Sequence, residues 1–146
     1  MADNFRTALN RIRALGRDHR SGAAEITDRA AGVLSDFVRA SRRPAANQPR
    51  RWRGQLAALA EATLRAQPSM APMMNLANQV ACAAEQGVSG QQLLRALEDF
   101  RRALRRANRR IARQFAARLR RRSVVLTYSY SSTVVAALLA ARGKLT

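Results

Sequence analysis

The sequence predicts a mainly α-helical protein, with a bundle of about five helices followed by the first βα unit of an α/β domain. Two observations lead to this prediction. Apolar residues recur at helical spacing through most of residues 5–121. Near Arg122 the composition changes from an arginine-dense helix to a β-branched run. We therefore divide the chain into a helical N-terminal domain, residues 1–122, and the truncated start of a C-terminal domain, residues 123–146.

The first two helices are expected on either side of a polar break at residues 18–22. The first ends near Gly16. Ser21 can cap the second, which ends by Ser41. Their apolar stripes are Phe5, Leu9, Ile12 and Leu15 on the first helix, and Ile26, Ala30, Val33, Leu34, Phe37 and Val38 on the second.

The third and fourth helices are expected on either side of the proline-punctuated segment 68–72. Pro49 suits the first turn of the third helix, and Pro68 ends it. The fourth helix ends at Gly87, and the single cysteine, Cys82, is expected to be a small core residue within it. The apolar stripes are Trp52, Leu56, Leu59 and Leu64, then Met73, Met74, Leu76, Ala77, Val80 and Ala84.

The fifth helix is predicted to be long, roughly residues 91–121, beginning after Ser89. Its apolar stripe is Leu94, Leu97, Phe100, Leu104, Ala107, Ile111, Phe115 and Leu119. Residues 101–122 contain 11 arginines and no acidic residue, in a chain of net charge +18. This run is open to three interpretations: a solvated helix face, a footprint for nucleic acid or another polyanion, or a surface for acidic patches on a partner chain.

Aromatic residues near the arginine run bear on the nucleic-acid interpretation. Phe100 and Phe115 belong to the apolar stripe, so they do not form a platform on which single-stranded bases could stack. This argues against binding by base stacking, and a basic helical nucleic-acid-binding protein is kept as an alternative. Non-specific affinity for RNA at low salt is expected in any case.

The last 24 residues predict a strand, a serine-rich turn and an apolar helix. The β-branched run 124–127 suits a strand that is covered on both faces. Ser131, Ser132 and Thr133 can cap the following helix, which is apolar nearly all round and expects cover on most sides. A parallel sheet needs further βα units, so we expect this chain to be the first part of a larger fold.

Composition limits the function classes. The longest apolar run, Val134 to Ala141, is far shorter than the roughly 20 residues that span a bilayer. No secretory signal opens the chain, and Cys82 alone allows neither an internal disulfide nor a cysteine-based zinc site. The only histidine, His19, is expected on a surface loop. We therefore expect a cytoplasmic protein without membrane partner, metal or cofactor.

Three segments carry a resemblance to a known family. They are Asp18-His-Arg-Ser-Gly-Ala-Ala-Glu-Ile26, Gln67-Pro-Ser-Met-Ala-Pro-Met-Met-Asn-Leu76 and Val124-Val-Leu-Thr-Tyr-Ser-Tyr-Ser-Ser-Thr133. In order and spacing they resemble motifs of the family that contains the alpha, beta and delta regulatory subunits of translation initiation factor 2B. The same family includes the isomerases of methylthioribose-1-phosphate and ribose-1,5-bisphosphate.

The resemblance implies a helical N-terminal domain, a Rossmann-like C-terminal domain and a pocket for a phosphorylated ligand between them. It also implies that most of the second domain is missing from this chain and that the full-length form is a homo-oligomer. The ligand would be a phosphorylated sugar or a nucleotide.

The same resemblance argues against isomerase chemistry. Where the isomerases carry Arg-Gly-Ala at the helix start, this chain has Ser21-Gly22-Ala23, with Arg20 one place earlier. Ser129 stands where they carry a catalytic cysteine, and a serine without a base beside it is a poor replacement. We therefore expect a non-catalytic, regulatory member, and keep a sugar-phosphate isomerase fragment as the alternative.

Two short segments supply the candidate ligand-binding residues. The start of the second helix offers free N–H groups that favour an anion, and a glycine that lets a phosphate approach closely. The turn after the strand lies where open α/β sheets bind ligands. The candidates for phosphate contacts are Arg20, Ser21, Gly22 and Ala23 in the first segment, and Ser129, Ser131 and Ser132 in the second. No catalytic residue is assigned.

Overall fold

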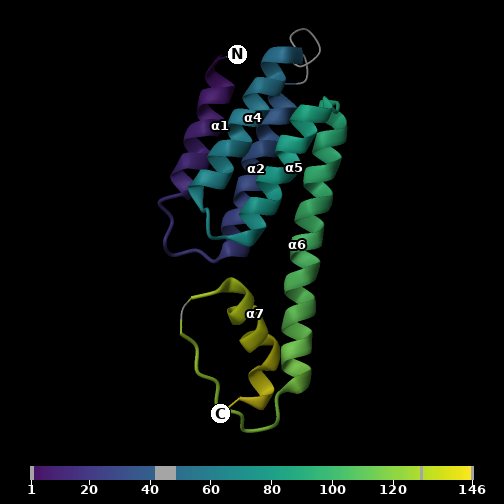
Figure 1. Cartoon of the computed structure of the whole chain (residues 1–146). Helices are drawn as coiled ribbons and strands as arrows, with labels where there is room; N and C mark the ends of the chain where they lie inside the picture. The colour runs from purple at the N-terminus through teal and green to yellow at the C-terminus, as the bar shows by residue number, and fades with distance from the viewer. Residues whose placement is uncertain (1, 42–48, 129, 146) are drawn as a thin grey trace.

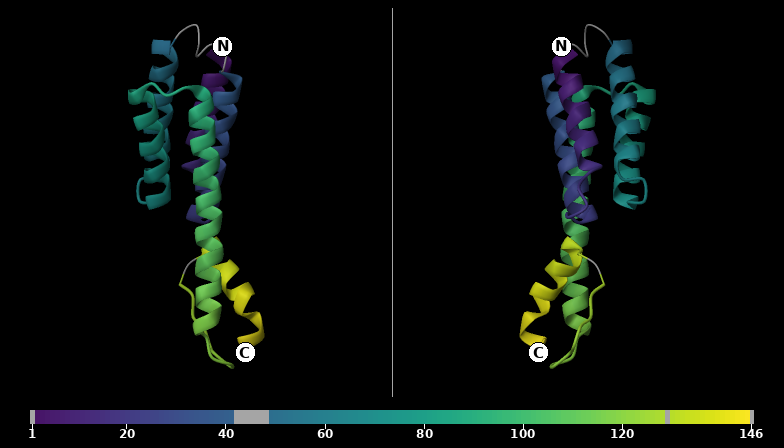
Figure 2. Two further views of the ribbon diagram at one scale, coloured as in Figure 1. Left: turned by 90° about the vertical axis from the view of Figure 1, so that its right-hand side faces the viewer. Right: turned by 90° about the vertical axis from the view of Figure 1, so that its left-hand side faces the viewer.

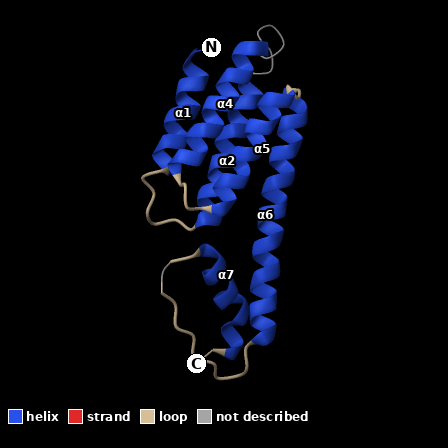
Figure 3. Ribbon diagram, viewed as in Figure 1, coloured by secondary structure: helices blue, strands red, loops and turns tan. Residues whose placement is uncertain are grey.

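The computed structural model describes residues 2–41, 49–128 and 130–145. Within these ranges the chain forms six α-helices and a short 3-10 helix, and no strand (Figure 3). The helices are α1 (Ala2–Leu15), α2 (Ala23–Ala40), α4 (Pro49–Ala66), α5 (Ala71–Gln86), α6 (Gly90–Arg118), α7 (Ser132–Ala141) and η1 (Arg142–Lys144). The predicted helical class is confirmed, whereas the predicted βα unit is not seen.

Five of these helices form an elongated bundle (Figure 1). α1 packs on α2 and α4, α4 packs on α5, and α2 also contacts α5 and α6. In Figure 2 the α4–α5 pair stands as one layer beside α1 and α2. The largest fully buried side chains include Ile12, Ile26, Leu34, Leu56, Leu59, Met73, Leu76, Leu93 and Leu97. Each contributes about 1.5–3 kcal/mol when buried, so the apolar stripes account for the core.

The expected helix ends are largely confirmed. α4 begins at Pro49 and ends before Pro68. Gly87 closes α5 with a left-handed φ of 65°, a conformation that favours glycine. Ser89 caps α6, its hydroxyl accepting from the amide of Gln92 at 3.2 Å. The cap of α2 is different, because Gly22 holds the N-cap position and the Ser21 hydroxyl instead donates to Asp18.

Some stripe residues lie outside the core, which corrects the expectation for them. Cys82 is exposed, so it is not a core residue. It follows buried Val80 by two positions, about 200° around the helix, which turns it away from the face that packs on α4 and α2. Leu64, Met74 and Ile111 are also more than a third exposed. His19 is exposed in a loop, as predicted.

α6 is longer than the bundle that it joins. Its first half is buried against the other helices through Leu93, Leu94 and Leu97. Its second half extends beyond the bundle and carries α7 on one side (Figure 1). The helix ends at Arg118 rather than Arg121, with Leu119 as its C-cap residue.

The segment predicted as a strand is a loop in the structure (Figure 3). Val124 is 89% exposed and Leu126 97% exposed, so the expected cover on both faces is wrong for this structure. A strand needs neighbouring strands for its hydrogen bonds, and in the described residues the only bridge joins Ser123 to Leu145. α7 packs on α6 and touches the start of α2, but Ala137 and Ala141 are its only fully buried residues. It therefore lacks the cover that was expected on most of its sides.

No helix in the described ranges combines the length and the apolar character needed to cross a bilayer.

Candidate ligand-binding cavity

A cavity of about 680 Å³ lies where the start of α2, the middle of α6 and the start of α7 meet. Its size is within the range of sites that hold small molecules. Both segments that the sequence singled out contribute to its wall. The lining residues are Arg20, Ser21, Ala24, Glu25, Asp28 and Arg29 from the α2 region, Leu104, Arg105 and Asn108 from α6, and Tyr130 and Ser132 near α7.

Asp18 fixes the loop that leads into α2. One carboxylate oxygen accepts from the amides of Ser21 at 2.9 Å and Arg20 at 3.0 Å. The other accepts from the Ser21 hydroxyl at 2.8 Å and from the guanidinium of Arg29. The Ser21 amide, with Arg29 and the other donors, holds the pKa of Asp18 far below its usual range. Ser21 and Arg29 are thereby held at the edge of the cavity.

The starts of α2 and α7 touch beside the cavity. A methyl group at position 22 would lie 2.8 Å from both the amide nitrogen and the hydroxyl of Ser132, so only glycine fits here. The Gly22 amide donates to Glu25 Oε2 at 3.0 Å, and Ser131 Oγ accepts from the amide of Val134 at 3.4 Å. Both helices present their positive ends at this contact, which favours an anion nearby.

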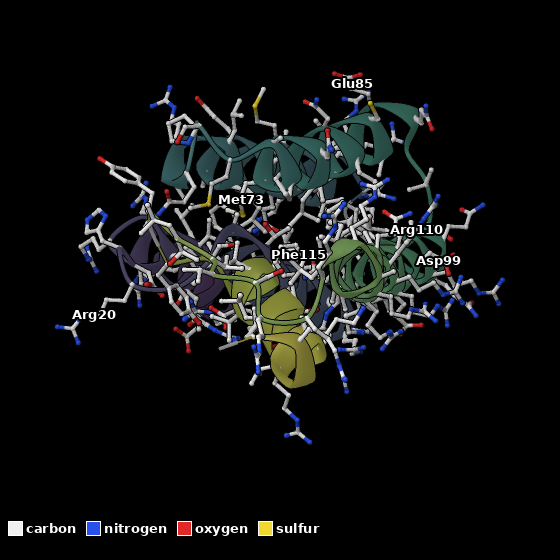
Figure 4. All side chains as sticks on the ribbon, turned by 90° about the horizontal axis from the view of Figure 1, so that it is seen from below. Arg20, Met73, Glu85, Asp99, Arg110 and Phe115 are labelled. Carbon is white, nitrogen blue, oxygen red and sulfur yellow. The ribbon has the colours of Figure 1, made fainter. Side chains whose placement is uncertain are left out.

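Two side chains beside this contact have polar atoms without a partner in the described residues. Ser132 Oγ is buried and has no hydrogen-bond partner in the described part of the chain. The Arg20 guanidinium likewise has no hydrogen-bond or ion-pair partner among these residues and extends into solvent, as Figure 4 shows. Both groups are therefore available to a ligand in the cavity.

Polar contacts tie α6 and the segment before α7 to α2. Asp28 accepts from Arg101 at 2.6 and 2.9 Å and from Arg105 at 3.1 Å. These guanidiniums, Arg101 first, lower the pKa of Asp28. Across the cavity, the Tyr130 hydroxyl donates to Glu25 Oε1 at 3.4 Å. The wall thus combines guanidiniums with carboxylates, and its arginines outnumber its acids.

The structure places the predicted candidate residues unequally. Three line the cavity: Arg20, Ser21 and Ser132. Gly22 is buried directly beside it. Ala23 is half-buried as the first residue of α2, and its carbonyl accepts from Thr27 Oγ1 at 2.6 Å.

The two remaining candidates are not part of this cavity wall. Ser131 caps α7 and lines a smaller neighbouring hollow with Tyr128 and Val134. Ser129 lies outside the described residues.

Sequence reasoning missed the residues that α2 and α6 contribute between these segments. Glu25, Asp28 and Arg29 follow Ser21 at helical spacing, and this spacing could have placed them on the same face of α2. Asn108 interrupts the arginine run, and its Oδ1 lies 3.1 Å from Thr133 Oγ1 on α7. No local signal identifies Asn108, because its partner is 25 residues away.

The fold and the cavity together define a helical-bundle protein with a net basic cavity where its C-terminal segment meets α2 and α6. The sequence matches the Initiation factor 2 subunit family over residues 19–145, and the chain therefore belongs to that family. This confirms the resemblance seen in the sequence. Searches of curated proteins and of solved structures gave no match.

Proposed function

We propose that this protein is a non-catalytic, regulatory-type member of the initiation factor 2 subunit family that binds a phosphorylated sugar or a nucleotide. One observation carries the proposal. A single cavity is lined from both segments in which the sequence motifs occur, the start of α2 and the start of α7. The family match and the single exposed cysteine favour a role in the cytoplasm.

The chemistry of the wall suits a ligand that carries both phosphate and hydroxyl groups. Guanidiniums of Arg20 and Arg105 can donate to phosphate oxygens, and the adjoining helix starts add positive potential. Carboxylates accept hydrogen bonds from sugar hydroxyls, and Glu25 and Asp28 offer them on the same wall. The unpartnered hydroxyl of Ser132 can bond to either group.

The same wall is poorly equipped for isomerisation. An acid–base catalyst needs a group poised to exchange a proton near neutral pH. Asp28 is held ionised by Arg101 and Arg105. Cys82 lies on α5, away from the residues that line the cavity. These positions favour binding over catalysis, and the isomerase fragment remains the second candidate only through the family.

Calorimetric titration of the protein with ribose-1,5-bisphosphate, methylthioribose-1-phosphate and nucleoside monophosphates tests the proposal. At least one should bind, and Arg20→Gln or Arg105→Gln should each weaken binding about tenfold or more, because a charged hydrogen bond is lost. Arg95→Gln, exposed on α6 and outside the cavity, is the matched control and should bind normally.

Three results would contradict the proposal. The first is the absence of binding by every ligand, and the second is equal weakening by the control variant. The third is conversion of a sugar phosphate to its ketose, detected by NMR, which would establish the isomerase instead.

A further inference from the structure

The projecting half of α6 carries four arginines on one side, Arg106, Arg109, Arg110 and Arg113, which we call the arginine face. All four are exposed. At 100° per residue they fall within about a third of the helix circumference, turned away from the side that packs on α7. Viewed along α6 in Figure 4, Phe115 lies toward α7 and Arg110 lies away from it.

The arginine face has no internal counter-charge. Three other arginines of α6 are paired: Arg101 and Arg105 with Asp28, and Arg102 with Asp99. No ion pair joins any of the four face arginines to an acid in the described residues. They are instead i, i+3 and i, i+4 neighbours of one another, a spacing at which like charges destabilise a helix. A bound polyanion would remove this repulsion.

We propose that the arginine face binds the phosphate backbone of a nucleic acid duplex, without reading its bases. Guanidiniums donate to phosphate in a planar fork, and a duplex supplies phosphates at high density along its axis. The face lies on the part of α6 that stands clear of the bundle, so a bulky ligand can reach it (Figure 1). The net charge of +18 attracts such a ligand from a distance.

The residues beside the arginine face distinguish this partner from two others. On the helix surface they are Ala103, Ala107 and Gln114, which are small or polar and exposed. Ile111, 47% exposed, instead lines the groove beside α7 with Phe115. With no large apolar side chain among the first three, the face cannot insert into a lipid surface. With no aromatic side chain, it cannot stack unpaired bases, so duplexes should bind more tightly than single strands.

Fluorescence anisotropy between about 50 and 200 mM salt tests the proposal. The probes are a short RNA duplex, the DNA duplex of the same sequence and one single strand of that DNA. The triple variant Arg106→Glu, Arg109→Glu, Arg113→Glu should weaken duplex binding about 100-fold near 0.1 M salt. The plot of log K against log salt should also become less steep, with a slope that is smaller in magnitude by about 2 to 3. Comparison of the RNA and DNA arms shows which duplex is preferred.

A matched triple, Arg13→Glu, Arg17→Glu, Arg50→Glu, changes the net charge equally at exposed positions on the bundle. It should cost far less affinity and leave the slope nearly unchanged. Replacement of the face arginines by glutamine, checked for helix content by circular dichroism, separates lost contacts from unfolding. Equal losses in the two charge-reversed triples would overturn the proposal. So would binding of an acidic peptide or anionic vesicles through the face in the absence of duplex binding.

Discussion

At the scale of single residues, Asp18 connects the loop before α2 to the cavity. Its carboxylate takes hydrogen bonds from the amides of Arg20 and Ser21, from the Ser21 hydroxyl and from Arg29. The acid therefore positions three residues of the cavity wall, although its own side chain is not part of that wall. Its low pKa shows how strongly these donors favour the ionised form.

The low pKa of Asp18 leads to a prediction about stability and pH. Because its pKa is lower in the folded than in the unfolded protein, its stabilising contribution is complete above the unfolded value of about 3.9. That contribution is lost as the pH falls through the folded value. Asp18→Asn should therefore be less stable than the wild type at neutral pH, with a difference that shrinks below pH ~4.

Urea denaturation at a series of pH values measures this difference. Asp3→Asn, at an exposed position in the first turn of α1, controls for the loss of one negative charge. A stability difference for Asp18→Asn that stayed constant down to the acid limit would refute the assigned role.

At the scale of helices, Gly22 sets how closely α7 approaches α2. Its φ of −74° suits any residue, so a substitution is limited by space and not by backbone conformation. Gly22→Ala would force the Ser132 backbone away, at a cost of about 1–3 kcal/mol, and should enlarge the gap beside the cavity. Gly32→Ala, in the same helix with open space around it, should instead stabilise by about 0.5–1 kcal/mol.

Thermal and urea unfolding of these two variants provide the test. If Gly22→Ala were as stable as Gly32→Ala, the starts of the two helices would not be in close contact.

The elements that could be predicted from sequence are those whose causes are local. Helical spacing, Pro49, Gly87 and Ser89 act within a few residues, and they predicted the positions of the helices closely. The β-branched run 124–127 has a preference for extended backbone, but a strand also needs a partner that spacing does not reveal. The run therefore lies in a loop in the structure and does not form a strand.

The residues of the candidate site also divide into those with local causes and those placed by packing between helices. Arg20, Ser21 and Ser132 could be proposed from motifs, because each lies at a helix start. Arg105 and Asn108 join them only because α6 packs on both α2 and α7. Such packing is a property of the tertiary structure, and a single sequence does not display it.

At the scale of the whole molecule, the C-terminal segment exposes apolar side chains. Leu126 is 97% exposed and Leu139 64% exposed, with Val124 and Tyr128 nearby in the chain. Exposed apolar surface of this kind favours association. We expect the chain to self-associate through this surface. The double variant Leu126→Lys, Leu139→Lys should shift the equilibrium toward the monomer by tenfold or more. The reason is that burial of two leucines in the interface would contribute about 3 kcal/mol.

Sedimentation velocity across a concentration series measures the change. Asn78→Lys, an added charge on the exposed side of α5, should leave association unchanged. A wild-type protein that stayed monomeric throughout, or a control that dissociated equally, would contradict the prediction.

The projecting half of α6 also has the geometry of a lever arm. The helix has 29 residues and is about 43 Å long, and the bundle grips only its first half. A bend of about 10° near Leu104 would carry the far end through about 4 Å, and α7 would move with it. Because the cavity is lined from α2 on one side of this point and from the start of α7 on the other, a ligand that filled it would hold the arm at one angle. Occupancy of a small site would then become a displacement at the tip of the molecule.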